Sequence, residues 1–380
     1  MKIAGAISGT SLDGIDVAIC NVVARDGRIG ATCDRFATIP FDDRLRDRIL
    51  AAYPPARIRA LDVSALHAAV GEAFGEAIRT VAAGLQLDAV ASHGLTLAHD
   101  GDAHHTLQIG DPFRIRERVR ATVVYDFRSA DTAAGGTGAP LVPFVDAILF
   151  AAYAPCVALN LGGIANMTVL PQCIAFDSGP SNLLIDSYVT LRSDGEQRYD
   201  RDGELARRGS PNVALLSGML DDPYFTALLP KTTGRERYGA DWVEQHRADL
   251  DRLTFEDAVA TLTALTVRTV ADALRSAASD AIRLIISGGG ARNPALVDGL
   301  RAELPGVEVT ISDELGVNAD AKEAIAFAVL GYCALTNRPA GMPSVTGASG
   351  PRILGAIAPF ELASLLDRMA ISESTNDGIE

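Results

Sequence analysis

The chain has 380 residues, 48% of them hydrophobic, and a formal net charge of −14 at pH 7. A chain of this length usually divides into two domains with separate cores, and its negative charge argues against nucleic acid as a partner. No apolar run reaches the roughly 20 residues of a membrane-spanning helix. The N-terminus lacks a secretory signal pattern, and five scattered cysteines without a C-x-x-C pair are typical of reduced thiols. We therefore expect a soluble, cytoplasmic protein that does not bind membranes.

Strand-like and helical segments alternate along the chain, which favours an α/β fold. The strongest strand candidates are LDAVAS, ATVVYDF, CVALNL and AIRLIIS. We expect a long helix over residues 254–278, capped by Thr254, and an almost wholly apolar helix that starts at Asp320. The glycine- and proline-rich run TAAGGTGAPLVP predicts the crossing between two lobes. We place the boundary at Asp131, giving lobes of residues 1–131 and 132–380, with the last segment packing back on the first lobe.

The opening turn, within SGTSLDGID, joins two strand-like segments. Its glycines permit conformations that point N–H groups at an anion, and its hydroxyls suit phosphate oxygens. Its carboxylates would act on phosphates through Mg²⁺. An ordinary hairpin is the simpler explanation of this motif taken alone, because it matches neither a Walker loop nor G-x-G-x-x-G. The candidate nucleotide-binding residues are Gly9, Thr10, Ser11, Leu12, Asp13, Gly14, Ile15 and Asp16.

A second unit, YAPCVALNLGGIANMTVL, repeats the strand, glycine turn and strand of the opening. Two such hairpins could face each other across a ligand cleft. The polar and glycine residues of this second turn are Asn160, Gly162, Gly163 and Asn166. Asp177 follows in FDSGPSN, where a carboxylate at a strand end is a natural general base. Taken alone, Asp177 is better explained as a cap of the helix expected after Pro180.

A third glycine turn, ISGGGARNP, leaves a strand and enters a helix capped near Asn293. Its three glycines, Gly288, Gly289 and Gly290, would let a flat ring lie against the backbone. A tight strand-to-helix turn without a ligand explains the same pattern. These motifs occur in the order expected of the sugar kinase, Hsp70 and actin superfamily.

More closely, the chain resembles the anhydro-N-acetylmuramic acid kinase family through an ordered set of motifs. These are GTSLDGID, SHGLTLAHD, TLQIGDP, DFRSADTAAGGTGAPLVP, NLGGIANMT, FDSGPSN, YDRDGELA, PKTTGRERY and SGGGARNP, and the resemblance runs from Ile3 to Leu354. It implies a two-lobed α/β sugar kinase/Hsp70/actin-like fold with a nucleotide cleft between the lobes. It also implies an enzyme of cell-wall recycling that uses ATP and Mg²⁺ to open and phosphorylate its anhydro amino sugar, giving N-acetylmuramic acid 6-phosphate.

The resemblance assigns roles to the candidate residues. The first two glycine turns would hold the ATP phosphates, and Gly288 to Gly290 would lie near the adenosine. Asp177 would take a proton from the water that attacks the anomeric carbon, and the freed oxygen 6 would accept the γ-phosphoryl group. Glu323, in DAKEAIAFA, is a second catalytic candidate that would order water or the Mg²⁺ region. Asp320 and Glu323 also have the spacing of a helix capping box, which is an equally good explanation.

Arg128, Asp131 and His93 are the candidate sugar contacts. A surface salt bridge is the alternative for Arg128 and Asp131, and a packed, hydrogen-bonded histidine is the alternative for His93.

Four positions depart from the family pattern. Leu95 and Thr137 stand where the family commonly has glutamine, and Ser178 and Ser181 stand where it more often has threonine and glycine. The loss of an amide at Leu95 weakens the expected sugar contacts more than the expected role of Asp177.

Two rival functions remain open from the sequence. A kinase for another sugar would keep ATP binding and use Asp177 on a hydroxyl group. A non-catalytic, nucleotide-gated binding protein would close on ATP without transferring phosphate, although Asp177 argues against it. The expected partner is a small-molecule substrate. The sequence leaves open whether the chain forms a homodimer and which residues bind the metal.

Overall fold

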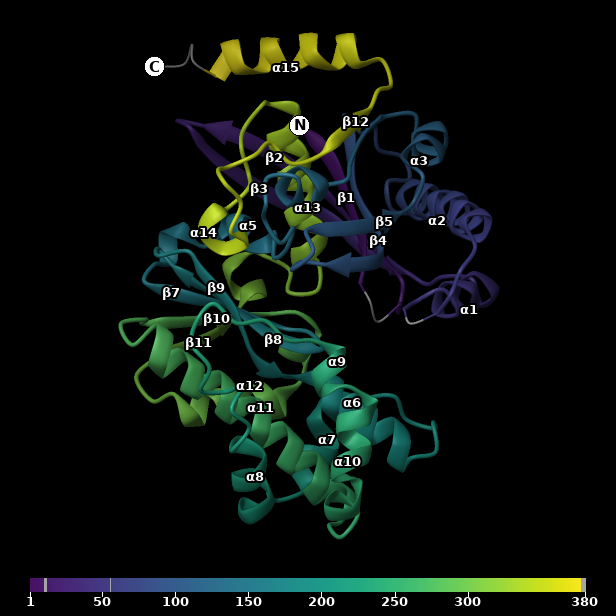
Figure 1. Ribbon diagram of the computed structural model, residues 1–380. Coiled ribbons are helices and arrows are strands. Elements are labelled where there is room, and N and C mark those ends of the chain that lie inside the picture. Colours follow the sequence, from purple (N-terminus) through teal and green to yellow (C-terminus); the bar gives the residue numbers. More distant parts are fainter. Residues whose placement is uncertain (10–11, 55, 377–380) are drawn as a thin grey trace. The chain divides into compact units, whose positions relative to one another are not determined.

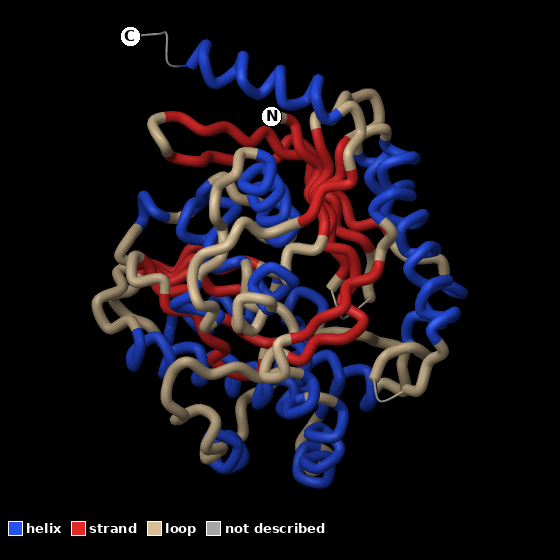
Figure 2. The backbone as a smooth tube through the Cα atoms, turned by 45° about the horizontal axis from the view of Figure 1, so that its top comes forward, coloured by secondary structure: helices blue, strands red, loops and turns tan. Residues whose placement is uncertain are grey.

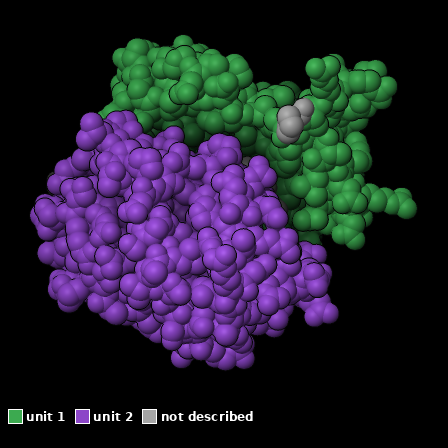
Figure 3. All heavy atoms as spheres, turned by 60° about the horizontal axis from the view of Figure 1, so that its bottom comes forward, with its two compact units in different colours: residues 1–149, 321–380 green, residues 150–320 purple. Residues whose placement is uncertain are grey.

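The computed structural model describes residues 1–9, 12–54 and 56–376 (Figure 1). Thr10 and Ser11 of the first predicted phosphate turn therefore lie outside the described residues. The chain forms two compact units, shown in Figure 3: unit 1 is Met1–Leu149 with Ala321–Glu380, and unit 2 is Phe150–Asp320. Each unit is built on its own β-sheet with flanking helices. The predicted α/β fold class is confirmed.

The division of the chain differs from the boundary expected at Asp131. Residues 132–149 belong to unit 1, where the backbone N–H of Thr137 donates to the carbonyl of Thr346 at 2.8 Å. The chain returns to unit 1 at Ala321. The glycine-rich run is thus a loop inside unit 1, because its polar groups find their hydrogen-bond partners there.

The sheet of unit 1 has the strand order β12-β6-β4-β1-β2-β3, and β5 pairs with β4. Its strands are β1 (Lys2–Ser8), β2 (Ile15–Arg25), β3 (Arg28–Ile39), β4 (Ala89–Asp100), β5 (His105–Ile109), β6 (Thr122–Tyr125) and β12 (Ala356–Ala358). Strands β1, β4 and β6 are parallel. Three predicted site elements lie near this end of the strands: Gly9 follows β1, His93 lies in β4 just beyond its pairing with β6, and Arg128 follows β6. Because carboxyl ends of parallel strands share one edge, this topology gathers candidates that lie far apart in sequence.

Helices cover both faces of this sheet (Figure 2). They are α1 (Asp43–Leu50), α2 (Ala60–Val81), α3 (Pro112–Val119), α4 (Ser129–Thr132), α5 (Val142–Leu149), α13 (Lys322–Leu335), α14 (Pro343–Thr346) and α15 (Leu362–Asn376). Ala4 and Ala6 of β1 share a core with residues of α2, whereas Gly5 between them faces α13. A Cβ atom at Gly5 would overlap the carbonyl oxygen of Ala324, so glycine is required for this close helix–strand approach. Helix α13 starts two residues after the predicted start at Asp320 and is almost wholly buried, as expected.

The sheet of unit 2 has the order β11-β10-β7-β8-β9, so β9 is an edge strand. Its strands are β7 (Cys156–Leu161), β8 (Ile164–Leu170), β9 (Ile174–Pro180), β10 (Arg283–Ser287) and β11 (Glu308–Ile311). Strands β7 and β8 form an antiparallel hairpin closed by Gly162 and Gly163, as β1 and β2 do across a longer turn. The predicted repetition of a strand, glycine turn and strand is therefore present in both units.

The helices of unit 2 pack around α11 (Phe255–Ala277), the long helix that the sequence predicted. The cap is also as predicted, since the Thr254 hydroxyl accepts the N–H of Asp257 at 3.1 Å. Leu262 and Leu265 are each 1% exposed, and full burial of such side chains contributes about 1.5 to 3 kcal/mol each. The other helices are η1 (Ala151–Tyr153), α6 (Asn182–Arg192), η2 (Arg201–Gly203), α7 (Glu204–Arg208), α8 (Val213–Leu220), α9 (Arg235–Tyr238), α10 (Ala240–Leu250), η3 (Gly289–Arg292), α12 (Pro294–Glu303) and η4 (Ser312–Leu315).

Among the described residues, no helix combines the length and the apolar character that crossing a membrane requires. All five cysteines are free thiols, and Cys20, Cys156 and Cys333 are buried.

Candidate active site

A row of polar residues crosses the sheet of unit 2. Asn160 on β7 is the register partner of Asn166 on β8, and Asn166 is in turn the partner of Asp177 on β9. Register partners in antiparallel strands project their side chains to the same face. The sheet thus places two amides and a carboxylate, predicted separately from two sequence motifs, on one face of three adjacent strands.

The second and third glycine turns meet at Asn160. A Cβ atom at Gly288 would lie 2.6 Å from the Asn160 Oδ1 atom, and a Cβ at Gly162 would lie 3.5 Å from its Nδ2 atom. Gly288 has φ +81°, a left-handed conformation that favours glycine. At Gly289 an added Cβ atom would meet nothing within 4 Å. The turn therefore leaves open backbone beside Asn160, as a site for phosphates and a flat ring requires.

The β7–β8 turn is fixed on the start of α6. The N–H groups of Ser181 and Asn182 donate to the carbonyls of Gly163 and Gly162 at 3.0 and 3.1 Å. Ser181 has φ −130°, so the turn forms without the conformational freedom of the glycine that the family more often has. The Ser178 hydroxyl donates to the Ala165 carbonyl at 3.1 Å and so keeps the bonding capacity of the usual threonine.

Asp177 is held by a segment that follows it by about fifty residues. Its backbone N–H donates to the Lys231 carbonyl at 3.0 Å, and its carbonyl accepts the Tyr224 hydroxyl at 2.8 Å. Its carboxylate Oδ2 atom accepts the N–H of Thr233 at 2.9 Å. Helix α6 has Ser181 at its N-cap and no side-chain cap, so Asp177 is not the helix cap that its sequence position also allowed.

The surroundings of Asp177 make its carboxylate a stronger base than an exposed one. Its pKa is raised to about 6, mainly by burial. The hydrogen bond from the Thr233 N–H lowers the pKa, and the nearby negative charge of Glu236 raises it further. The carboxylate is therefore mostly ionised at pH 7, with a pKa close enough to neutrality to accept a proton efficiently.

In unit 1, the first glycine turn is partly built into the core. Leu12 and Ile15 are each 1% exposed, so only their backbone is available to a ligand. Gly14 lies against Ile39, where an added Cβ would be 2.8 Å from the carbonyl oxygen. Asp13 is exposed, and the Asp16 carboxylate accepts the Thr38 hydroxyl at 2.6 Å.

His93 and Arg128 form a defined pair in unit 1. The His93 Nδ1 atom lies 3.2 Å from the Gly94 carbonyl and therefore carries the proton, while Nε2 accepts the Nε–H of Arg128 at 2.9 Å. Burial lowers the pKa of His93 well below its usual value, and the charge of Arg128 acts in the same direction. His93 is thus a neutral group that orients Arg128, whose Nη1 donates to the Gly138 carbonyl at 2.7 Å.

Asp131 is completely buried, and both carboxylate oxygens are occupied. Oδ2 accepts the N–H of Gly138 at 2.8 Å, and Oδ1 accepts the Thr346 hydroxyl at 2.8 Å. Its partners therefore come from the glycine-rich loop and from α14. Asp131 holds these two segments together instead of presenting an oxygen to a ligand.

Glu323 lies in the first turn of α13 and is half-buried. The N-cap of this helix is Ala321, and the Asp320 carboxylate pairs with Arg292 at 2.9 Å, so the two acids do not form the predicted alternative of a capping box. Burial raises the pKa of Glu323, while the charges of Lys322 and Arg128 oppose the shift. Burial lowers the pKa of Arg128 to about 10, and Glu323 opposes that shift.

The other two departures from the family pattern, Leu95 and Thr137, are in unit 1. Leu95 is 0% exposed and belongs to the core that contains Val70 and Ile109. Thr137 donates its hydroxyl to the Ala139 carbonyl at 2.7 Å. Both side chains are used in packing or loop structure.

Four residues that no sequence signal assigned to the site support its carboxylates: Tyr224, Lys231, Thr233 and Thr346. The motif PKTTGRERY contains Lys231 and Thr233 but indicates no role for them by itself. Its position in the chain gave no indication that it lies along Asp177. Thr346 had no distinguishing sequence signal.

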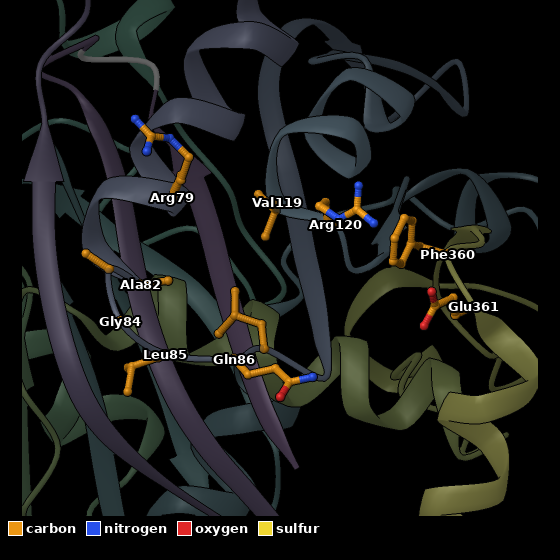
Figure 4. A pocket seen from close by; sticks show the side chains of 11 residues that line it. Arg79, Ala82, Gly84, Leu85, Gln86, Val119, Arg120, Phe360 and Glu361 are labelled. Atoms are coloured by element: carbon orange, nitrogen blue, oxygen red, sulfur yellow. The ribbon is translucent and has the colours of Figure 1, made fainter.

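A cavity of about 670 Å³ lies elsewhere in unit 1 (Figure 4). Arg79, Leu85, Val119, Arg120 and Phe360 are among its lining residues, and the Arg120 guanidinium lies 5.3 Å from the centre of the Phe360 ring. Residues 82–87 of its wall precede β4, whereas His93 lies within that strand. None of the predicted site residues lines it.

No group of three or more His, Cys, Asp or Glu side chains suited to a metal occurs within the described ranges.

Glycine turns after the central strands, polar residues on one sheet face and a carboxylate with a raised pKa are features typical of phosphate-binding α/β proteins. The sequence pattern of the anhydro-N-acetylmuramic acid kinase family matches residues 1–360, and the chain belongs to this family. It is similar to "Anhydro-N-acetylmuramic acid kinase" of Rhodococcus erythropolis, at 40% identity over 378 residues and 94% of each chain. The protein of the same name from Streptomyces coelicolor is 42% identical over 374 residues, again 94% of each chain.

Proposed function

We propose that the protein is an ATP-dependent kinase that opens 1,6-anhydro-N-acetylmuramic acid with water and phosphorylates it to N-acetylmuramic acid 6-phosphate. It would act in the recycling of cell-wall peptidoglycan, in the cytoplasm. Membership of the family supports the substrate and the use of ATP. The observation that supports the chemistry is the carboxylate of Asp177. Its pKa is about 6, and it lies in the same cross-strand row as Asn160 and Asn166.

Asp177 activates water in this mechanism. Its free carboxylate oxygen takes one proton from water while the water oxygen bonds to the anomeric carbon. The bond between that carbon and oxygen 6 breaks, and oxygen 6 attacks the γ-phosphorus of ATP. ADP leaves, so that water, ATP and the anhydro sugar give the sugar phosphate, ADP and a proton. Attack opposite the departing ether oxygen inverts the anomeric carbon.

The ATP phosphates are assigned to the first turn, Gly9 to Asp16, and to the β7–β8 turn with Asn160 and Asn166. The adenosine is assigned to Gly288, Gly289 and Gly290. Mg²⁺, when bound with the nucleotide, would neutralise charge between the phosphates. Asp13 and Asp16 are the carboxylates of the first turn that would hold it.

Arg128 is the proposed sugar contact in unit 1, because its guanidinium is oriented by His93 and by the Gly138 carbonyl. Asp131 contributes by fixing the loop that carries Gly138. Glu323 is the proposed second acid, and its raised pKa suits a group that exchanges hydrogen bonds with water.

The test is an incubation of the protein with ATP, Mg²⁺ and anhydro-N-acetylmuramic acid in ¹⁸O-labelled water, followed by mass analysis. We expect one ¹⁸O on the anomeric hydroxyl, none in the phosphate ester, and a single initial anomer. A kinase for another sugar would leave this substrate unchanged, and a nucleotide-gated binding protein would form no sugar phosphate. Label in the phosphate would contradict the role of oxygen 6 as the acceptor.

A further inference from the structure

The segment 222–238 lies along the outer edge of β9, where an edge strand would otherwise have no neighbour. It contacts Asp177 at three points: the backbone N–H, the backbone carbonyl and the carboxylate bind Lys231, Tyr224 and Thr233 respectively. One segment therefore determines both the backbone position and the side-chain direction of the proposed base.

Lys231 closes this segment on itself. Its buried ammonium group donates to the Tyr224 carbonyl at 2.9 Å and to the Phe225 carbonyl at 2.8 Å, and it lies 4.7 Å from the centre of the Tyr224 ring. The ammonium thus links the two parts of the segment that hold Asp177. One part carries Tyr224, and the other carries the Lys231 carbonyl and the Thr233 N–H. The Phe225 ring also packs on Gly179, two residues beyond Asp177.

The start of the segment is anchored separately at Asp222. Its carboxylate accepts the Tyr224 N–H at 2.9 Å, the Tyr238 hydroxyl at 3.0 Å and the guanidinium of Arg237. Because Asp222 is already compensated by Arg237, the charge of Lys231 is not needed to neutralise it. Within the described residues, the Lys231 ammonium donates its hydrogen bonds to the carbonyls of Tyr224 and Phe225.

We infer that Lys231 is a positioning residue for the reaction: its ammonium locks segment 222–238 so that Tyr224 and Thr233 hold the Asp177 carboxylate in place to accept the proton of water. This inference rests on the proposed role of Asp177 as the base. It adds a group that touches neither ATP nor the sugar and acts through the backbone of a neighbouring segment.

The same contacts predict how the pH profile would change. The Thr233 N–H favours the ionised carboxylate of Asp177, whereas Glu236 and burial disfavour it. Tyr224 stays neutral because burial and the charge of Asp177 raise its pKa. Asp222 and Arg237 pair with each other, and Lys231 faces the tyrosine and the two carbonyls. Loosening the segment weakens the Thr233 bond, so the pKa of Asp177 should rise.

The experiment compares Lys231→Met with the wild type. We expect kcat to fall roughly tenfold to a hundredfold, as a displacement of a catalytic group produces, with the KM for ATP changed by less than about twofold. The acid limb of the kcat profile should move to higher pH by about half a unit to one unit, because one stabilising hydrogen bond to the carboxylate is weakened. Lys2→Met is the matched control, because the Lys2 ammonium pairs with exposed Asp34. Its loss should change neither kcat nor the pH of the acid limb.

A second variant keeps the test decisive if Lys231→Met does not fold. Tyr224→Phe removes only the hydroxyl that binds the Asp177 carbonyl, and it should lower kcat and shift the acid limb in the same direction. In the double variant the loss in kcat, expressed as a free energy, should be smaller than the sum of the losses in the two single variants, because both residues act through one segment. Either single variant with wild-type kcat and an unmoved acid limb overturns the inference, as do fully additive effects. Absence of sugar phosphate with the wild-type protein instead overturns the proposed function.

Discussion

Asp177 within β9 and Asp131 within α4 are both carboxylates that the sequence predicts as site residues, yet their surroundings give them opposite roles. Asp131 in unit 1 is 0% exposed, and each of its oxygens accepts a hydrogen bond. Asp177 in unit 2 is half-buried, and one carboxylate oxygen accepts the Thr233 N–H. Burial raises the pKa of Asp177 to about 6. A buried carboxylate with all its bonds made stabilises the fold, whereas one left with a free oxygen retains the capacity to react.

The largest expected effect in this comparison is on turnover in Asp177→Asn. The amide keeps the shape of the side chain but cannot take a proton from water, so kcat should fall roughly 10³-fold, about 4 kcal/mol in the barrier. ATP binding, measured by calorimetry, should stay nearly unchanged. Retention of more than about a tenth of the wild-type rate would show that another group is the base.

Asp131→Asn should instead act on stability. The amide oxygen of the new side chain can accept only one of the two donors well, and its NH₂ group faces the other, so we expect a loss of about 2 to 3 kcal/mol in the free energy of unfolding. Denaturant titration at pH 7 measures this loss. Turnover per folded molecule should fall far less than in Asp177→Asn, and an equal fall would give Asp131 a direct part in the chemistry.

The third prediction is that Asp177→Asn stabilises the protein at pH 7, by about 1 to 2 kcal/mol after allowance for partial exposure. The folded pKa of about 6 lies above the unfolded value of about 3.9, so the folded state binds more protons between these values. Stability of the wild type therefore falls as pH rises from about 4 through 6, and the variant should lack this fall. Unfolding curves at pH 4 and pH 7 test it, and a variant less stable than the wild type at pH 7 would contradict it.

The smallest effect is expected for Thr346→Val, which removes one donor to Asp131 and leaves the Gly138 bond intact. We expect a loss of about 1 kcal/mol in unfolding free energy. In a double-mutant cycle with Asp131→Asn the two losses should not be additive, because the residues are in contact. Strict additivity would mean that the hydrogen bond between them contributes nothing to stability.

Local sequence signals predicted much of the fold. The helix capped by Thr254, the apolar helix near Asp320 and the strands 156–161 and 283–287 depend on caps and hydrophobic patterns within one segment. The two glycine hairpins could be recognised for the same reason. The boundary near Asp131 could not, because the hydrogen bonds that keep the glycine-rich loop in unit 1 join its Thr137 to Thr346, about two hundred residues later.

The sequence by itself determined the family, the glycine turns and the candidacy of Asp177, because each of these depends on which residues stand next to one another in the chain. Tertiary structure decided what each carboxylate does. It aligned Asn160, Asn166 and Asp177 through strand register and brought segment 222–238 against Asp177. It also enclosed Asp131 between Gly138 and Thr346. Basicity depends on burial and on hydrogen-bond partners, and both are set by residues distant in sequence.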